Sequence, residues 1–133
     1  MAKKNPVVHF EMPYENSERV SSFYTQAFGW EMFNTGEQMG HYLLAGTAET
    51  DENRMVKTPG TINGGFFPKQ PDSDNLHPSF VISVDDIHDA MNKIKAAGGT
   101  VHGEPVEITG IGLYVSFTDT EGNRASVMQA MRG

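Results

Sequence analysis

The sequence contains no cysteine, so disulfides, thiolate metal sites and a cysteine nucleophile are all excluded. It also has no uninterrupted apolar stretch approaching the ~20 residues that a membrane helix needs. Lys3 and Lys4 are not followed by the apolar segment of a secretion signal. Together these absences predict a cytoplasmic protein without a membrane partner.

Positive charge is scarce as well. The chain has 10 Lys and Arg residues against 17 Asp and Glu residues, which gives a formal net charge of −7. This balance opposes the basic surface that supplies most nucleic-acid affinity, so nucleic acid is not expected as a partner. The G-x-S-x-G elbow, the G-x-x-x-x-G-K-[ST] phosphate loop and the H-E-x-x-H pair are also missing, which disfavours those enzyme classes.

What is present is typical of one folded domain. The chain has 133 residues, of which 38% are hydrophobic and 20% are charged, far from the composition of disordered proteins. A chain of this length can bury a moderate core but leaves no room for a separate second domain. We therefore expect a single domain over residues 1–133.

The order of predicted elements is the same in the two halves of the chain. A strand at residues 7–12 precedes a helix that is capped by Asn16 or Ser17 and ends at Gly29. A strand at 79–84 precedes a second helix, which starts after Asp86 and stops at Gly99. Three short strand patterns follow each helix, at 31–35, 40–46 and 61–68 and then at 100–108, 112–119 and 124–131. This repeat predicts an α+β fold of two βαβββ modules, at about 6–68 and 78–131.

Each predicted helix carries apolar residues at helical spacing along one face, which is expected to meet the sheet. In the first helix these are Val20, Phe23, Tyr24, Ala27 and Phe28, and in the second Ile87, Ala90, Met91, Ile94 and Ala97.

Four local motifs in this order resemble the vicinal oxygen chelate (VOC) superfamily of glyoxalases, bleomycin resistance proteins and dioxygenases. They are VVHFEM at 7–12, SERVSSFYTQAFGW at 17–30, FVISVDDIHDAMNKIKAAGGTV at 80–101 and DTEGNRASVMQ at 119–129. The similarity is greatest to the branch of enzymes related to lactoylglutathione lyase. The resemblance implies a curved mixed sheet that forms a cup around a small-molecule site.

In metal-using members of that superfamily, four side chains from the first and last strands of the two modules hold the ion. The resemblance places His9 at the first of these positions, Ser79 at its repeat partner and Ser126 at the last-strand position of the second module. The matching strand of the first module, residues 62–67, contains no acid. Hydroxyls are poor substitutes for imidazole and carboxylate donors. We therefore expect no metal, no other cofactor and no metal-dependent glyoxalase activity.

An alternative metal site is left open by the neighbouring residues. Strand alternation places Glu11 on the same face as His9, and His77 precedes Ser79 by two positions. A non-standard site made of His9, Glu11 and His77 is therefore the alternative to a hydrogen-bonded His9 in a polar cavity.

Alternation also predicts which residues line the ligand site. Phe80, Ile82 and Val84 are expected to pack under the second helix, as Val8, Phe10 and Met12 do under the first. The predicted ligand-binding residues lie on the opposite face: His9, Glu11, Tyr42, Gly65, Phe67, Ser79, Tyr114, Ser126 and Met128. The Gly64-Gly65 pair inside a strand calls for a bulge or a close approach by another group.

Two functions are compatible with this pattern. The first is a small-molecule binding protein or lyase/isomerase-like enzyme without the usual metal ligands, with His9 as the acid/base and Glu11 as its polar partner. The alternative is a protein that sequesters an antibiotic or metabolite without catalysis. The resemblance also implies a homodimer, with Trp30 either in the interface or in the core.

Overall fold

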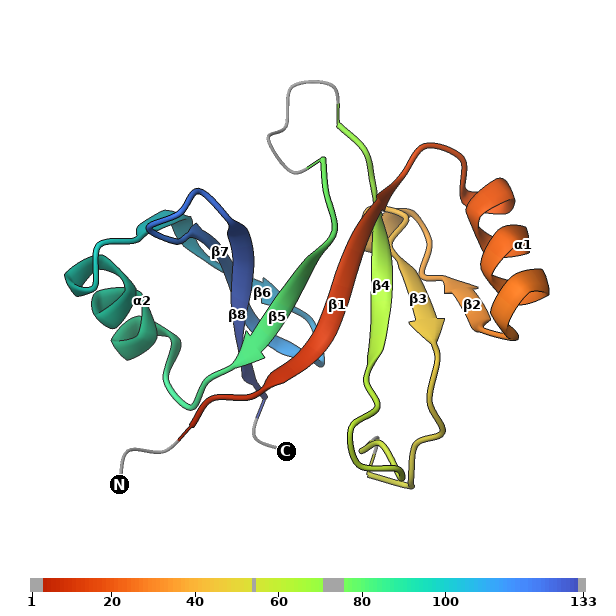
Figure 1. Cartoon of the computed structure of the whole chain (residues 1–133), viewed down its shortest axis with the longest axis horizontal. Helices are drawn as coiled ribbons and strands as arrows, with labels where there is room; N and C mark the ends of the chain where they lie inside the picture. Colours follow the sequence, from red (N-terminus) through yellow and green to blue (C-terminus); the bar gives the residue numbers. More distant parts are fainter. Residues whose placement is uncertain (1–3, 54, 71–75, 132–133) are drawn as a thin grey trace. The chain divides into compact units, whose positions relative to one another are not determined.

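The computed structural model describes residues 4–53, 55–70 and 76–131. The chain divides into two compact units, which we call the first unit (residues 9–78) and the second unit (residues 1–8 and 79–133). Each unit contains one long helix and a four-stranded sheet (Figure 1).

The first unit holds most of β1 (Val7–Tyr14) and the five elements that follow it. These are α1 (Ser17–Phe28), β2 (Glu31–Asn34), the short 3-10 helix η1 (Glu37–Met39), β3 (Leu43–Gly46) and β4 (Asn63–Pro68). The strands lie in the order β2-β3-β4-β1. β1 and β4 are parallel, and the other neighbours are antiparallel.

The second unit repeats this plan. It holds β5 (Ser79–Ser83), α2 (Ile87–Ala96), β6 (Thr100–Ile108), β7 (Gly112–Thr118) and β8 (Arg124–Ala130). The strand order is β5-β8-β7-β6, again with one parallel pair, β5 and β8. The predicted α+β fold class with two βαβββ modules and mixed sheets is confirmed.

The helices begin and end where their capping residues dictate. The Asn16 side chain accepts a hydrogen bond from the Arg19 backbone N–H at 2.9 Å, so Asn16 is the N-cap and Ser17 the first helical residue. Gly29 closes α1 in the left-handed conformation, with φ of 72°. Asp86 caps α2 in the same way, through the Asp89 N–H at 3.0 Å. None of the helices in the described residues is long and apolar enough to cross a membrane.

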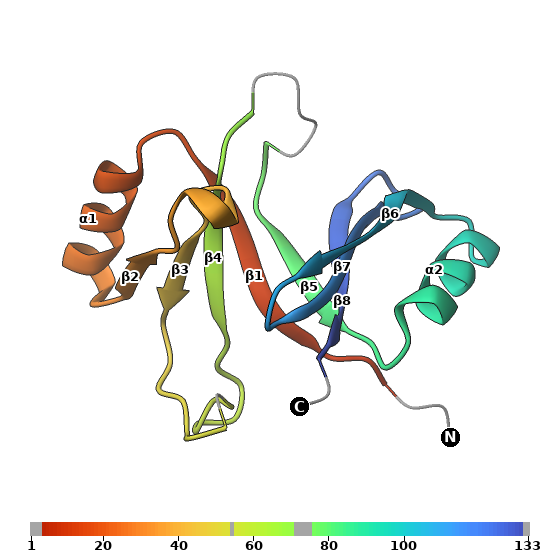
Figure 2. The same ribbon diagram turned by 180° about the vertical axis from the view of Figure 1, so that it is seen from behind.

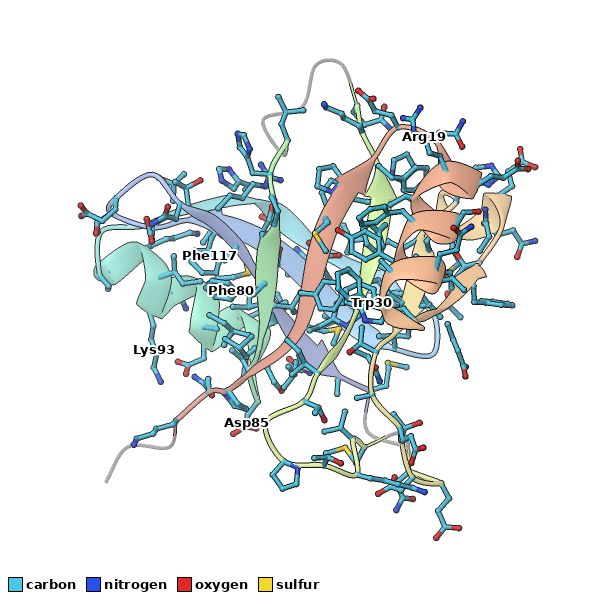
Figure 3. The ribbon with its side chains drawn as sticks, turned by 45° about the vertical axis from the view of Figure 1, so that its right-hand side comes forward. Arg19, Trp30, Phe80, Asp85, Lys93 and Phe117 are labelled. Carbon is cyan, nitrogen blue, oxygen red and sulfur yellow. The ribbon has the colours of Figure 1, made fainter. Side chains whose placement is uncertain are left out.

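The core of the first unit lies between α1 and one face of its sheet. Phe10 and Met12 of β1 pack there, as predicted, against buried residues of β1, β3 and β4: Tyr14, Leu43, Ala45 and Phe66. Val8 was expected there too, but it is exposed and is not part of this core. Trp30 stacks on Tyr24 with ring centroids 4.6 Å apart, so it belongs to this core (Figure 3). Because β1 alternates, His9 and Glu11 point to the opposite face.

The apolar face of α1 is narrower than its spacing predicts. Val20 and Tyr24 pack against the core. Phe23 and Phe28 instead remain 58% and 63% exposed, because they lie at the flanks of this face, where Phe23 contacts Tyr24 and Phe28, and Phe28 also contacts Tyr24 and Trp30. The prediction that Phe23, Ala27 and Phe28 meet the sheet is therefore wrong, since all three are exposed.

In the second unit, α2 packs against β6, β7 and β8 (Figure 2). The buried core consists of Val84, Ile87, Met91, Val115 and Val127. Ile82 and Phe117 pack against this core, as alternation requires. Phe80 was expected there too, but it is 44% exposed, because α2 packs mainly over β6, β7 and β8 rather than over β5.

Candidate functional site

Three of the predicted site residues form one hydrogen-bonded chain in the first unit. Nε2 of His9 lies 2.9 Å from the Tyr42 hydroxyl, and that hydroxyl donates to Oε2 of Glu11 at 3.0 Å. His9 is half-buried, and Glu11 is only 6% exposed. An imidazole and a buried carboxylate are thus joined through a single phenol.

The direction of these hydrogen bonds assigns the tautomer of His9. A phenol has one proton, and here it is donated to the Glu11 carboxylate. The Tyr42 oxygen must therefore accept from His9, which requires the proton of the neutral imidazole to sit on Nε2. Nδ1 is then the basic nitrogen, and within the described residues no group is hydrogen-bonded to it.

Burial sets the charge of His9. Desolvation disfavours the imidazolium and lowers the pKa of His9 below its ordinary value. At neutral pH the ring is therefore an uncharged base rather than a cation.

Gly65 makes room for Tyr42. Glu11 of β1 pairs with Gly65 of β4, so both face the same side of the sheet. A Cβ atom at position 65 would overlap the Tyr42 ring, which crosses the strand at this point to reach Glu11. The close approach expected for the glycine pair is therefore an intramolecular one, and at Gly64 the neighbour is the Phe10 ring on the other face.

The backbone at Tyr42 is fixed by side chains on both sides. The Tyr14 hydroxyl donates to the His41 carbonyl at 2.7 Å, and burial raises the pKa of Tyr14, which keeps it a donor. The Tyr42 carbonyl accepts from Oγ1 of Thr35 at 2.7 Å and from its N–H at 3.0 Å. His41 has a φ of 58°, a strained value for a residue other than glycine. These contacts hold the phenol where it can bridge His9 and Glu11.

The second unit carries an equivalent tyrosine. Gly65 is opposite Leu44, and Ser126 is opposite Ser116, so the registers place Tyr42 and Tyr114 at matching positions of the two modules. The Ser126 hydroxyl donates to the Tyr114 hydroxyl at 2.7 Å. Met128 pairs with Tyr114, and Ser79 lies on the same face of β5 as Val81, the partner of Ser126. Phe67 follows Gly65 on the corresponding face of the first unit.

The residues of this chain do not fit the metal that the fold implies. Across residues 4–53, 55–70 and 76–131, no three His, Cys, Asp or Glu side chains gather closely enough to hold an ion. His77 is exposed in a bend before β5, so the alternative site of His9, Glu11 and His77 is wrong. The polar groups of the second unit are hydroxyls, which are weak ligands for divalent ions.

The sequence predicted the members of the His9 cluster but not their connection. Tyr42 was expected only as one of the residues that line the ligand site, because periodicity places a side chain on a face without saying how far its hydroxyl reaches. Arg124 and Ser116, which are hydrogen-bonded to each other on the Ser126 face, were missed. Arg124 precedes Ser126 by two positions on the same strand, and this spacing could have indicated that both side chains lie on one face of the sheet.

Comparison with known proteins identifies the family. Residues 7–127 match the model of the Glyoxalase/Bleomycin resistance protein/Dioxygenase superfamily. The chain belongs to this superfamily. A relative in this superfamily, named probable lactoylglutathione lyase, from Vibrio cholerae is 28% identical over 125 residues, which cover 92% of this chain and 89% of that protein.

Solved structures of two methylmalonyl-CoA epimerases share the fold. A variant of Streptomyces coelicolor methylmalonyl-CoA epimerase, in complex with 2-nitronate-propionyl-CoA, matches with a TM-score of 0.68 and 14% identity over 95% of this chain and 97% of that one. Methylmalonyl-CoA epimerase from Mycobacterium tuberculosis matches with a TM-score of 0.66 and 11% identity, over 95% of this chain and 88% of that one. At these identities the likeness concerns the fold alone.

Proposed function

We propose that this protein is a lyase/isomerase-like enzyme of the superfamily that moves a proton on a small molecule with His9 as its acid/base. The observation that carries the proposal is the chain from His9 through Tyr42 to Glu11. The name of the Vibrio cholerae relative, probable lactoylglutathione lyase, supports the same lyase/isomerase class.

In the proposed reaction, Nδ1 of His9 takes a proton from a carbon next to a carbonyl group of the ligand. The lowered pKa keeps His9 unprotonated and ready to accept it. The imidazolium that forms donates more strongly from Nε2 to Tyr42, and the buried Glu11 carboxylate stabilises the positive charge through the phenol. Return of the proton to another face or atom of the ligand completes an isomerisation, with no net oxidation and no metal ligand required.

The experiment is a thermal-shift screen of metabolites and antibiotics, followed by product analysis for every hit. We expect at least one hit to be converted, and His9→Ala and Glu11→Gln to abolish turnover while the melting temperature stays near that of the wild type. His88→Ala, at an exposed position on α2, is the matched control and should keep full activity.

The alternative function is sequestration of an antibiotic or metabolite, as the name of the superfamily allows. It requires a shaped site but no acid/base. Hits that bind tightly and are recovered unchanged, in wild type and His9→Ala alike, would establish sequestration and overturn the enzymatic proposal. We also propose that the protein is cytoplasmic and forms a homodimer.

A further inference from the structure

A second polar cluster lies on one face of the sheet in the second unit. Ser116 of β7 pairs with Ser126 of β8, and Thr118 pairs with Arg124, so their side chains share a face. Nη2 of Arg124 donates to Oγ of Ser116 at 3.0 Å. The guanidinium therefore lies along the sheet beside Ser116 and Ser126, both of which are at least nine-tenths buried.

This guanidinium has no carboxylate partner among the described residues. The ion pairs there join Arg19 and Lys69 to Glu15, and Lys93 to Asp89 (Figure 3 labels Arg19 and Lys93). Nε of Arg124 is buried and, within the same residues, has no hydrogen-bond acceptor. A buried N–H of a cation without an acceptor is costly, so this arrangement calls for an anionic group.

Neither acid of the turn before Arg124 is paired with it: Glu121 accepts from the Thr120 hydroxyl at 3.0 Å, and Asp119 is bonded within the turn. Oδ1 of Asp119 accepts the backbone N–H groups of Glu121 and Asn123 at 2.8 and 2.9 Å, and Oδ2 accepts Nδ2 of Asn123 at 3.1 Å. These bonds lower the pKa of Asp119, which keeps it ionised in the turn. Asp119 is thereby held in the turn between β7 and β8, while its neighbour Arg124 bonds to a serine.

We propose that Arg124, with Ser116 beside it, binds an oxyanion, the carboxylate or phosphate group of an acidic small molecule. The planar fork of Arg offers five N–H donors, of which Ser116 takes one, and it suits the two oxygens of such a group. This inference rests on the proposed function in one respect: it takes the anionic group to be part of the small molecule that the protein converts. An anion is selected here although the chain as a whole carries a net charge of −7.

The test is an NMR titration of the Arg Nε–H signals at constant ionic strength. The probes are malonate, inorganic phosphate and malonamide, which is the neutral counterpart of malonate. We expect the Arg124 signal, assigned by its loss in Arg124→Lys, to shift saturably with malonate, phosphate or both, and not with malonamide. Tighter binding of malonate would identify the group as a carboxylate, and tighter binding of phosphate would identify it as a phosphate.

Arg124→Gln should weaken this binding by at least about tenfold, because it removes both the charge and the fork. Arg19→Gln, at an exposed residue paired with Glu15, is the matched control and should bind as the wild type does. An unmoved Arg124 signal, an equal response to malonamide, or equal loss in Arg19→Gln would overturn the site. The titration of the wild type decides the question even if Arg124→Gln fails to fold.

The two proposals fail separately. Anion binding should persist in His9→Ala, because the donors of the proposed site come from Arg124 and Ser116. Turnover that depends on His9, together with no response at Arg124, would leave the proposed function standing and remove the oxyanion site. Binding at Arg124 without any conversion of a ligand would leave the oxyanion site standing and remove the proposed function.

Discussion

The ring of Tyr42 lies over Gly65, in the space that any side chain at position 65 would fill. We predict that Gly65→Ala displaces the ring, separates the phenol from Glu11 and lowers the free energy of unfolding by about 1–3 kcal/mol through overpacking. Denaturant unfolding and turnover should both report the change. Gly46→Ala is the control, since a Cβ there would make only ordinary contacts with Glu31, at 3.5 and 3.6 Å. Equal effects of the two substitutions would contradict the assigned role of Gly65.

Tyr42→Phe removes only the hydroxyl that joins His9 to Glu11. We expect the free energy of unfolding to fall by about 1–3 kcal/mol, because a hydrogen bond to a buried carboxylate is lost. Turnover should fall by roughly one to two orders of magnitude if the phenol stabilises the imidazolium.

Tyr24→Phe is the matched control for that variant. It removes a hydroxyl from a ring that packs on Trp30 in the core of the same unit, and it leaves the bonds of Tyr42 to His9 and Glu11 in place. Turnover should therefore remain near that of the wild type. If Tyr24→Phe reduces turnover as much as Tyr42→Phe does, the phenol at position 42 has no special role.

The fold was largely predictable because it depends on patterns that alternate or repeat. The registers of β1 with β4 and of β5 with β8 place His9 and Ser79 at matching positions, as the repeat implied. Phe10 and Met12 pack on the α1 side because a strand exposes successive residues to opposite faces. The exposure of Phe80 could not be read from the same rule, because alternation does not say how far a helix extends over a sheet.

The site was less predictable because it depends on how far side chains extend, and not only on which face of the sheet they occupy. His9 and Glu11 share a face by alternation, but their connection runs through Tyr42, which is distant in sequence and is aimed by the strained His41 backbone. The role of Gly65 is likewise visible only once the Tyr42 ring is placed over it. Arg124 was overlooked because a charged residue next to a turn is usually solvated, whereas here it lies along the sheet.

The lowered pKa of His9 predicts a specific dependence of stability on pH. The unfolded chain binds a proton near the ordinary value of 6.5, and the folded protein binds it only at lower pH. The free energy of unfolding should therefore be fully retained above that value and should decrease as pH falls from 6.5 through the folded pKa. His9→Gln should flatten this slope in denaturant titrations. If the pH dependence of the free energy of unfolding is retained in His9→Gln, or is lost in the exposed control His88→Gln, it does not come from His9.

Assembly is tested by light scattering at micromolar concentration. β2 in the first unit and β6 in the second are end strands of their sheets, and such strands are readily covered by a partner. We expect a mass about twice the 14.6 kDa of the chain. A mass near 14.6 kDa would rule out the homodimer. Because Trp30 packs with Tyr24 in the core, Trp30→Ala should lower stability rather than simply release monomers.

The central claim is that His9 is a neutral base whose Nε2 proton is held by Tyr42. Two-bond proton–nitrogen NMR spectra of the His9 ring at neutral pH test it directly, with Tyr42→Phe for comparison. The account predicts a protonated Nε2 and an unprotonated Nδ1 in the wild type, with a nitrogen spectrum that changes in Tyr42→Phe. A proton on Nδ1, a doubly protonated ring at neutral pH, or a spectrum indifferent to Tyr42→Phe would contradict it.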